Sequence, residues 1–309
     1  MSLRVAVLMG GPSAEAEVSR NSASQVAAAL EQQNHIVERI ELDNGAADSL
    51  SQFSPDVVFP ALHGPPGEDG TVQGFLEILG YKYVGSDVHG SAVAMDKSVA
   101  KQVFAQHGLP ILPDLVISPG DALEDAQDII DNSWGPAVVI KPLNQGSAIG
   151  VTPLPNGGDV QAALASAMQY GPCLIEPYVM GKEITVGVLE RNGELIPHPV
   201  IEIRTSSDEW YDYENRYAVG QSEHVIPAPL SAETQEELQR IAVCAHQALG
   251  LRDLSRADFI VTEEEDISLL EVNTLPGMTP TSLYPDGARH LGYEFDQLMD
   301  LLVRQASER

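Results

Sequence analysis

Cysteine is almost absent from this chain of 309 residues, which contains only Cys173 and Cys244. Two isolated cysteines with no Cys-x-x-Cys pair argue against a disulfide framework and against a cysteine-based metal site. Long apolar runs are also lacking, so no segment is predicted to span a membrane. Residues 1–5 show neither the apolar region nor the cleavage site of a signal peptide. We therefore expect a cytoplasmic protein without a membrane partner.

Positive charge is scarce as well. The chain has 17 Lys and Arg against 45 Asp and Glu, which gives a formal net charge of -28. An excess of this size repels nucleic-acid phosphates and anionic lipid headgroups, so nucleic acid is excluded as a general partner. If the substrate is itself an anion, such as a nucleotide, the few basic residues have to be concentrated in its site. The length and the hydrophobic content of 43% predict a soluble protein of two or three domains.

The N-terminal part of the chain alternates between strand and helix patterns. A buried strand is predicted at residues 3–9, followed by a helix at 13–33 and by further strands at 36–42 and 56–62. This order is typical of a βαβ unit with a parallel sheet. Ligands bind at the carboxyl ends of such strands, where Glu15 and His63 would both lie. Glu15 is then either a helix-dipole residue or the receiver of a cation such as an ammonium group, and His63 is either a solvated loop residue or part of the same site.

The rest of the chain is predicted to combine helices with an antiparallel sheet. We expect helices at 71–79, 92–107, 231–250 and 294–306, and strands at 81–85, 137–142, 174–179, 183–189, 194–203, 256–261 and 267–273. The strands at 174–179 and 183–189 are expected to follow one another in one sheet, because only a short turn joins them. Residues 110–119 are rich in proline and are interpreted as a linker. Residues 210–217 are aromatic, polar and aperiodic, which favours a mobile loop or lid over a core element.

Two polar side chains close the last predicted strand. Glu271 and Asn273 are two residues apart, so both point to the same face of an extended strand. A carboxylate and an amide oxygen side by side are hard ligands that suit Mg2+ together with nucleotide phosphates. A strand end with a solvated Glu and a turn-forming Asn explains these two residues equally well. The hairpin would bring Asp258 close to both of them and complete a cluster of three metal ligands.

A second candidate site follows the strand at 137–142. Lys141 precedes a loop of small residues, 145–150. The backbone N–H groups of such a loop can lie over phosphates, with Lys141 as the counter-charge. Loops of this composition are common, so the pattern by itself is a weak signal.

Seven short motifs follow one another from residue 10 to residue 283. They read GGPSAEAEVS (10–19), HGPPGEDG (63–70), AMDK (94–97), GKEITV (181–186), YDYE (211–214), LEVNTLPGMT (270–279) and SL (282–283). In these motifs the chain resembles the D-alanine–D-alanine ligases of bacterial peptidoglycan synthesis, which have the ATP-grasp fold. The resemblance covers almost the whole chain, and the order of the seven motifs makes it specific.

The resemblance implies an α/β protein in which an N-terminal parallel βαβ domain is followed by an ATP-grasp fold of two subdomains, α+β in character. We expect an N-terminal substrate domain at residues 1–96, a small ATP-grasp subdomain at 97–181 and a catalytic domain at 182–309. The implied reaction transfers the γ-phosphate of ATP to the carboxylate of a first D-alanine. The amine of a second D-alanine then attacks the acyl phosphate, and phosphate leaves from a tetrahedral intermediate. The resemblance also implies two Mg2+ ions, replaceable by Mn2+, and a homodimer.

Roles for individual residues also follow from the resemblance. The metal ions would be held by Asp258, Glu271 and Asn273. The nucleotide would be bound by Lys97, Lys141, Glu176, Glu183 and Arg216. The ammonium group of the first D-alanine would contact Glu15, which belongs to a hydrogen-bonded set with Ser147 and Tyr217, and His63 would lie near the substrates. The developing oxyanion would be stabilised by Arg256 and the N–H of Gly277, and the second D-alanine would be held by Ser282 and Leu283.

The motifs also depart from the family pattern. Ala16 stands where the family usually has Arg, Pro65 and Pro66 replace small or basic residues, Ala148 replaces a second Ser in the glycine loop, and Arg216 replaces a Lys. These departures bear on substrate range and efficiency more than on the reaction. Family members that make the D-alanyl-D-lactate ester tend to have Phe at the position of Tyr217. Tyrosine there favours an amine as the second substrate, either D-alanine or D-serine.

Two alternatives stay open at this level. One is an ATP-grasp ligase with a different second substrate, such as D-serine, D-lactate or another amino acid. The other is a nucleotide-binding protein that has lost turnover. Arg256 argues against the second alternative, because nucleotide binding alone does not need an oxyanion donor.

Overall fold

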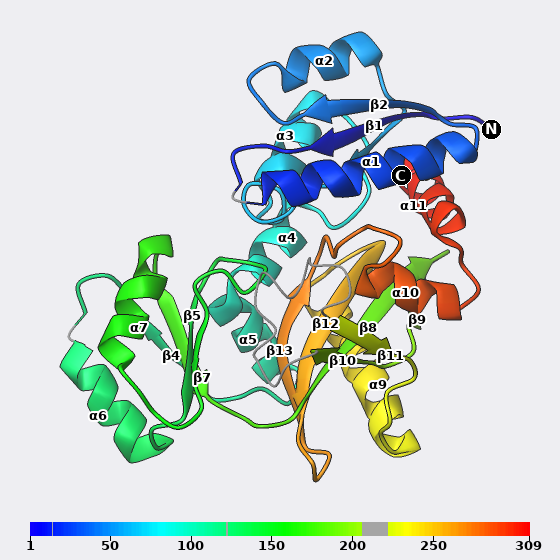
Figure 1. Cartoon of the computed structure of the whole chain (residues 1–309). Coiled ribbons are helices and arrows are strands. Elements are labelled where there is room, and N and C mark those ends of the chain that lie inside the picture. The colour runs from blue at the N-terminus through cyan, green and yellow to red at the C-terminus, as the bar shows by residue number, and fades with distance from the viewer. Residues whose placement is uncertain (14, 122, 206–221) are drawn as a thin grey trace.

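The structure is a computed structural model that describes residues 1–13, 15–121, 123–205 and 222–309. These residues form one parallel and two antiparallel sheets, with helices packed around them (Figure 1). The combination of a parallel N-terminal sheet with later antiparallel sheets confirms the predicted fold class. Among the described helices, none combines the length and the apolar character needed to cross a bilayer.

The N-terminal sheet is parallel and has the strand order β2-β1-β3. Its strands are β1 (Arg4–Met9), β2 (Ile36–Glu41) and β3 (Val57–Pro60), close to the predicted bounds. Its helices are α1 (Ala16–Gln32), α2 (Ala46–Phe53) and α3 (Thr71–Leu79). The four central residues of β1 are buried because helices cover both faces of the sheet.

The start of α1 differs from the prediction, which placed it at residue 13. The Ser13 hydroxyl donates to the backbone carbonyl of His63 at 2.8 Å and accepts from the N–H of Glu15 at 3.1 Å. Ser13 therefore connects the turn after β1 to the loop after β3, and the helix begins only at Ala16.

The region between the first and second sheets contains two helices instead of one. α4 (Val88–Met95) and α5 (Lys97–Gln106) replace the helix predicted at 92–107. They are separated at Asp96, whose backbone is extended. The Asp96 carboxylate accepts hydrogen bonds from N–H groups in the first turn of α5 and so caps this helix. The strand predicted at 81–85 is reduced to a single bridge between Val58 and Tyr83. The predicted linker at 110–119 contains the short strand β4 (Leu115–Ile117).

The second sheet is antiparallel and has the order β4-β7-β5-β6. It consists of β4 together with β5 (Val138–Pro142), β6 (Thr152–Leu154) and β7 (Cys173–Pro177). The helices α6 (Leu123–Ser133) and α7 (Val160–Ala167) cover it, and a short 3-10 helix follows at Met168–Tyr170.

The third sheet is the largest and contains the predicted hairpin. Its strands run in the order β11-β10-β8-β12-β13, with β9 paired to β8. Their bounds are β8 (Lys182–Arg191), β9 (Glu194–Pro197), β10 (Ile201–Thr205), β11 (Ser222–Val225), β12 (Leu254–Val261) and β13 (Ile267–Asn273). The helix α9 (Ala232–Ala248) packs on it, capped by the Ser231 hydroxyl as the serine position predicts.

Two strand predictions in this region are wrong. The strands at 174–179 and 183–189 do not share a sheet, because β7 belongs to the second sheet and β8 to the third. The residues between them pass from one sheet to the other. The single strand predicted at 194–203 is two strands, β9 and β10, separated around Pro199, which has no N–H to donate to a ladder.

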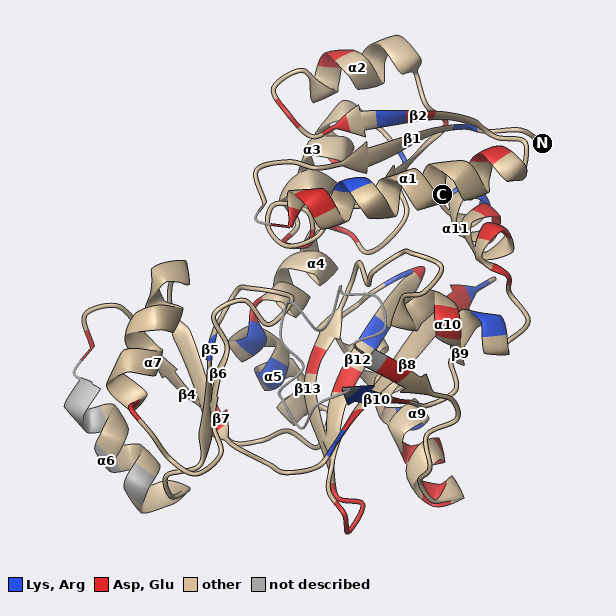
Figure 2. Ribbon diagram, viewed as in Figure 1, with Lys and Arg blue, Asp and Glu red and all other residues tan. Residues whose placement is uncertain are grey.

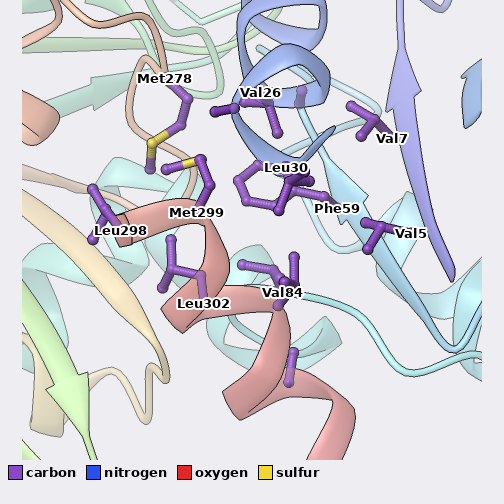
Figure 3. Close-up of a cluster of buried hydrophobic side chains, with 14 of the residues drawn as sticks. Val5, Val7, Val26, Leu30, Phe59, Val84, Met278, Leu298, Met299 and Leu302 are labelled. Atoms are coloured by element: carbon purple, nitrogen blue, oxygen red, sulfur yellow. The ribbon is translucent and has the colours of Figure 1, made fainter. Parts of the chain in front are cut away.

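The C-terminal helices return to the first part of the chain. α10 (Leu283–His290) packs on β8, and α11 (Phe295–Glu308) packs on α1 and β3. Leu298, Met299 and Leu302 of α11 enter the same buried cluster as Leu30 and Phe59 (Figure 3). The last helix therefore completes the core of the N-terminal sheet, and both chain ends lie beside that sheet (Figure 1).

Candidate active site

Most side chains to which the resemblance gives a role line one cleft of about 1180 Å³. The lining includes His63, Ser147, Glu183, Arg256, Asp258, Glu271, Asn273, Gly277, Ser282 and Leu283. A second pocket lies against β5, β7 and α5 and is lined by Lys97, Lys141 and Glu176 with several apolar side chains. Gly146, Ile260, Leu270 and Glu271 line both, so the two spaces adjoin. Figure 2 shows acidic and basic residues side by side on β12 and β13, and basic residues on α5.

The hairpin β12–β13 brings the predicted metal ligands together. Asp258 lies directly opposite Glu271, and Arg256 lies directly opposite Asn273. The Asp258 carboxylate accepts from Arg256 Nε at 2.9 Å and Nη2 at 2.7 Å, and from Asn273 Nδ2 at 2.9 Å. Thr185 on β8 donates a further hydrogen bond to Asp258 at 2.6 Å. The carboxylate is thus fixed by donors from three neighbouring strands.

This donor set fits a hard divalent cation. Asp258, Glu271 and Asn273 offer two carboxylates and one amide oxygen on the same face of the hairpin, and oxygen ligands are those that Mg2+ prefers. Among the described residues there is no group of three or more His, Cys, Asp or Glu arranged to hold a metal ion, and this set reaches three oxygen donors only when the amide of Asn273 is included.

The predicted phosphate-side lysines lie beside this set. Lys97, the first residue of α5, donates to the carbonyl of Gln145 at 2.7 Å and forms an ion pair with Glu271 at 3.1 Å. It thereby links the glycine loop to the hairpin. Lys141 of β5 is buried and bonded to Glu176 of β7.

Glu176 is held between two lysines. Its two carboxylate oxygens contact Lys101 and Lys141, and Lys101 also pairs with Asp114 at 3.1 Å. Burial alone would raise the pKa of Glu176, but the charges of Lys141 and Lys101 outweigh it and hold this pKa below its ordinary value. Lys101 had no role in the sequence prediction. Its spacing of four residues from Lys97 places both lysines on the same face of a helix, but this spacing does not identify Glu176 as the partner of Lys101.

The predicted contact between Glu15 and Ser147 is present. Ser147 Oγ donates to Glu15 Oε1 across 132 residues of sequence, joining the start of α1 to the glycine loop. Ser147 and Ala148 both have left-handed backbones, with φ of 48° and 56°. Tyr217, Arg216 and the predicted lid at 210–217 lie outside the described residues.

Two titratable groups with shifted pKa values flank this contact, His63, which is buried, and Glu68, which is partly buried. Burial lowers the pKa of His63 to about 4, with a further decrease from the charge of Arg256, so the imidazole is neutral at pH 7. Burial raises the pKa of Glu68 to about 8, and the neighbouring charge of Glu15 adds to it. Glu68 accepts from the N–H of Gly64 at 2.7 Å. Glu68 belongs to the HGPPGEDG motif, but the sequence did not predict that it lies close to Glu15.

The predicted acceptor end lies in the turn between β13 and α10. Ser282 is the N-cap residue of α10, and its hydroxyl contacts Thr279 Oγ1 at 2.8 Å. A Cβ added at Gly277 would approach Ser282 Oγ to 3.1 Å, so the turn is tight at this glycine. Glu183 lines the main cleft beside Ile260, at the boundary with the second pocket.

Taken together, the two antiparallel sheets border a pocket that contains two lysines, an oxygen-donor set lies next to it, and α1 with the loop after β3 lines the N-terminal side of the cleft. These features define an enzyme of the ATP-grasp class. The comparisons with known proteins agree. A family model described as "D-ala D-ala ligase C-terminus" matches residues 103–304, and one described as "D-ala D-ala ligase N-terminus" matches residues 43–86.

Relatives and solved structures point the same way. A D-alanine–D-alanine ligase from Desulforudis audaxviator is 42% identical over 100% of both chains. The structure of D-alanine–D-alanine ligase from Bacillus anthracis complexed with ATP matches 99% of this chain and 98% of its own, at 28% identity and a TM-score of 0.84. The VanG D-Ala:D-Ser ligase from Enterococcus faecalis matches 99% of this chain and 100% of its own, at 29% identity and a TM-score of 0.83. The chain belongs to the D-alanine–D-alanine ligase family.

Proposed function

We propose that this protein joins two D-alanines to D-alanyl-D-alanine, using ATP and Mg2+, for the synthesis of peptidoglycan precursors. The observation that carries the proposal is the convergence, in one cleft, of the Ser147–Glu15 contact with Arg256 and the oxygen-donor hairpin. A receptor for an ammonium group, an oxyanion donor and a phosphate-side cation site are what a carboxylate–amine ligation needs. Family membership over the full chain supports the same assignment.

In the first step, the carboxylate of one D-alanine attacks the γ-phosphorus of ATP, and ADP leaves. Glu15 would hold the ammonium group of this D-alanine, because its carboxylate is buried and oriented by Ser147. Lys97 and Lys141 would contact the phosphates. Glu176, kept ionised by its two lysines, would accept from the adenine amine, and Glu183 would contact the ribose. Mg2+ held by Asp258, Glu271 and Asn273 would supply neutralisation of phosphate charge.

In the second step, the amine of the other D-alanine attacks the acyl carbon, loses a proton, and phosphate leaves. Arg256 and the N–H of Gly277 would stabilise the oxyanion that develops at the acyl oxygen. Arg256 is held in place by its two contacts with Asp258. His63 is neutral, so it can orient a substrate by a hydrogen bond without adding charge. Ser282 and Leu283 would hold the carboxylate of the second D-alanine.

Other parts of the assignment also stay proposals. Tyr217 would complete the set with Glu15 and Ser147, and Arg216 would contact phosphate. The domain limits at residues 96 and 181, the homodimer and the number of metal ions are expectations from the family resemblance, and the cytoplasmic location is an expectation from the composition.

The test is a substrate panel with purified protein, ATP and Mg2+. Phosphate release and dipeptide formation are measured with D-alanine, D-serine, D-lactate, L-alanine and no added substrate. We expect phosphate release only with D-alanine, D-alanyl-D-alanine as the product, and loss of both on chelation of Mg2+. Product formation restricted to D-alanine plus D-serine or D-lactate would favour the alternative acceptor. ATP binding without ADP formation under any condition would contradict the proposal.

A further inference from the structure

We propose that His224, Asp286 and Arg289, here called the α10 cluster, position the turn that receives the second substrate. These are positioning residues, and they act through the backbone of residues 279–282. The inference rests on the proposed function, since it concerns the acceptor side of the same cleft. None of the three residues belongs to the motifs on which the family resemblance is based.

The arrangement on α10 carries the first part of the inference. Ser282, Asp286 and Arg289 are four and then three residues apart, so they lie on one face of the helix. That face is directed into the main cleft, because all three residues line it. His224 lines the same cleft from β11, the edge strand paired to β10. The cluster is therefore adjacent to the predicted acceptor residue and comes from two elements far apart in sequence.

The contacts form a continuous chain from the sheet edge to the turn. His224 Nδ1 lies 2.7 Å from Asp286 Oδ2, and Arg289 Nη1 donates to Asp286 Oδ1 at 2.5 Å. Arg289 Nη2 then donates to the backbone carbonyl of Pro280 at 2.8 Å. Glu294, 3.9 Å from Arg289 Nε, is a further charged group beside the cluster. Asp286 thus aligns Arg289, and Arg289 holds the turn.

The turn itself needs such a support. Pro280 has no N–H, so its carbonyl is the backbone group through which this residue can be held. On either side of it, Thr279 and Ser282 contact each other through their side chains at 2.8 Å. A shift of the Pro280 carbonyl would move Ser282 relative to Gly277, and a group that positions a substrate loses much of its effect when it is misplaced by about 1 Å. The side chains of His224, Asp286 and Arg289 are 15%, 20% and 38% exposed, so the contact between His224 and Asp286 is largely shielded from solvent and holds its geometry better than a surface pair would.

The experiment separates the two D-alanine sites kinetically. In His224→Phe and in Arg289→Lys, we expect the KM for the second D-alanine to rise on the order of tenfold, as for loss of a hydrogen bond to a charged group. The KM values for ATP and for the first D-alanine should stay within about twofold. His224→Gln retains an N–H that can reach Asp286 and should restore most of the affinity. Arg289→Lys keeps the positive charge at a side chain that is 38% exposed, so we expect this variant to fold. It therefore tests the inference even if His224→Phe is unstable.

The chain offers a matched control in the pair His35–Asp300. Its Nε2–Oδ1 distance is also 2.7 Å, and it lies outside the cleft. His35→Phe should leave the KM for the second D-alanine unchanged. The inference is overturned if both cluster variants keep the wild-type acceptor KM, or if all three KM values rise together. Absence of dipeptide from the wild-type protein would instead contradict the proposed function.

Discussion

Asp258 is the residue on which the contacts of the site converge. It receives hydrogen bonds from Arg256, Thr185 and Asn273. The sequence pattern predicted its position near Glu271 and Asn273, because a hairpin is a local structure whose register follows from alternation along two adjacent strands. Thr185 could not be found in this way, since it reaches Asp258 only through the pairing of β8 with β12, which are distant in sequence.

At the residue scale, Glu271→Gln is expected to abolish turnover with little change in stability. The substitution keeps the size of the side chain but removes one of the two carboxylates proposed to hold Mg2+, and with it the partner of Lys97. Phosphate release and the free energy of unfolding are measured in parallel. Glu263→Gln, on the exposed turn of the same hairpin, is the matched control and should keep wild-type activity. Near-normal turnover of Glu271→Gln would show that the ligand assignment is wrong.

A second residue-scale prediction concerns pH and His198. This side chain is fully buried, its ring nitrogens have no hydrogen-bond partner among the described residues, and burial lowers its pKa to about 3. The unfolded chain takes up a proton below a pKa of about 6.5 while the folded chain does not, so stability falls as pH decreases from there towards 3. Between pH 6.5 and pH 5 this amounts to about 2 kcal/mol for one histidine.

His198→Phe should remove this part of the pH dependence. Denaturant unfolding at pH 7 and pH 5 gives the change in free energy, and His107→Phe on the surface is the control. His246 and His63, whose pKa values burial lowers to about 4, keep part of the dependence in the variant. An unchanged loss of stability between the two pH values would contradict the role of His198.

At the scale of elements, the break between α4 and α5 presents Lys97 to the site. The Asp96 carboxylate accepts from the N–H groups of Ser98 at 3.0 Å and Val99 at 3.1 Å, which starts a new helix at Lys97. The sequence predicted one continuous helix, because the apolar pattern runs through both segments. The capping residue is present in the AMDK motif, but only the structure shows that its backbone is extended, with ψ of 100°.

Asp96→Ala should therefore affect both stability and nucleotide binding. Loss of the cap is expected to cost about 1 kcal/mol, and fraying of the first turn should raise the KM for ATP several-fold because Lys97 loses its orientation. Asp96→Asn can still accept from the same N–H groups and should stay close to wild type. If the KM for ATP is the same in the alanine variant and in the wild type, the Asp96 cap does not contribute to nucleotide binding.

At the scale of the whole molecule, the two ends of the chain build one core. α11 carries Leu302, which is fully buried against the N-terminal cluster. The amphipathic pattern predicted that this helix packs on a core, but which core it joins is decided by tertiary contacts. The same holds for β7 and β8, which are neighbours in sequence and lie in different sheets.

Leu302→Ala is expected to lower the free energy of unfolding by about 2–5 kcal/mol, the usual cost of such a cavity. The effect should reach β1 and β3, since α11 covers them, and hydrogen exchange of their backbone amides should become faster. Leu301→Ala, at a partly buried position of the same helix, should cost less. If only the amides of α11 itself lose protection, the two ends do not form one cooperative core.

The sequence by itself determined the local features of this protein. Strand and helix patterns, the β12–β13 hairpin and the family motifs all depend on residues close together in the chain, where spacing translates directly into geometry. Tertiary structure alone decided which segments meet. It placed Lys101 on Glu176 and brought His224 to Asp286. Such contacts arise from packing between distant elements, and no periodicity along the chain encodes them.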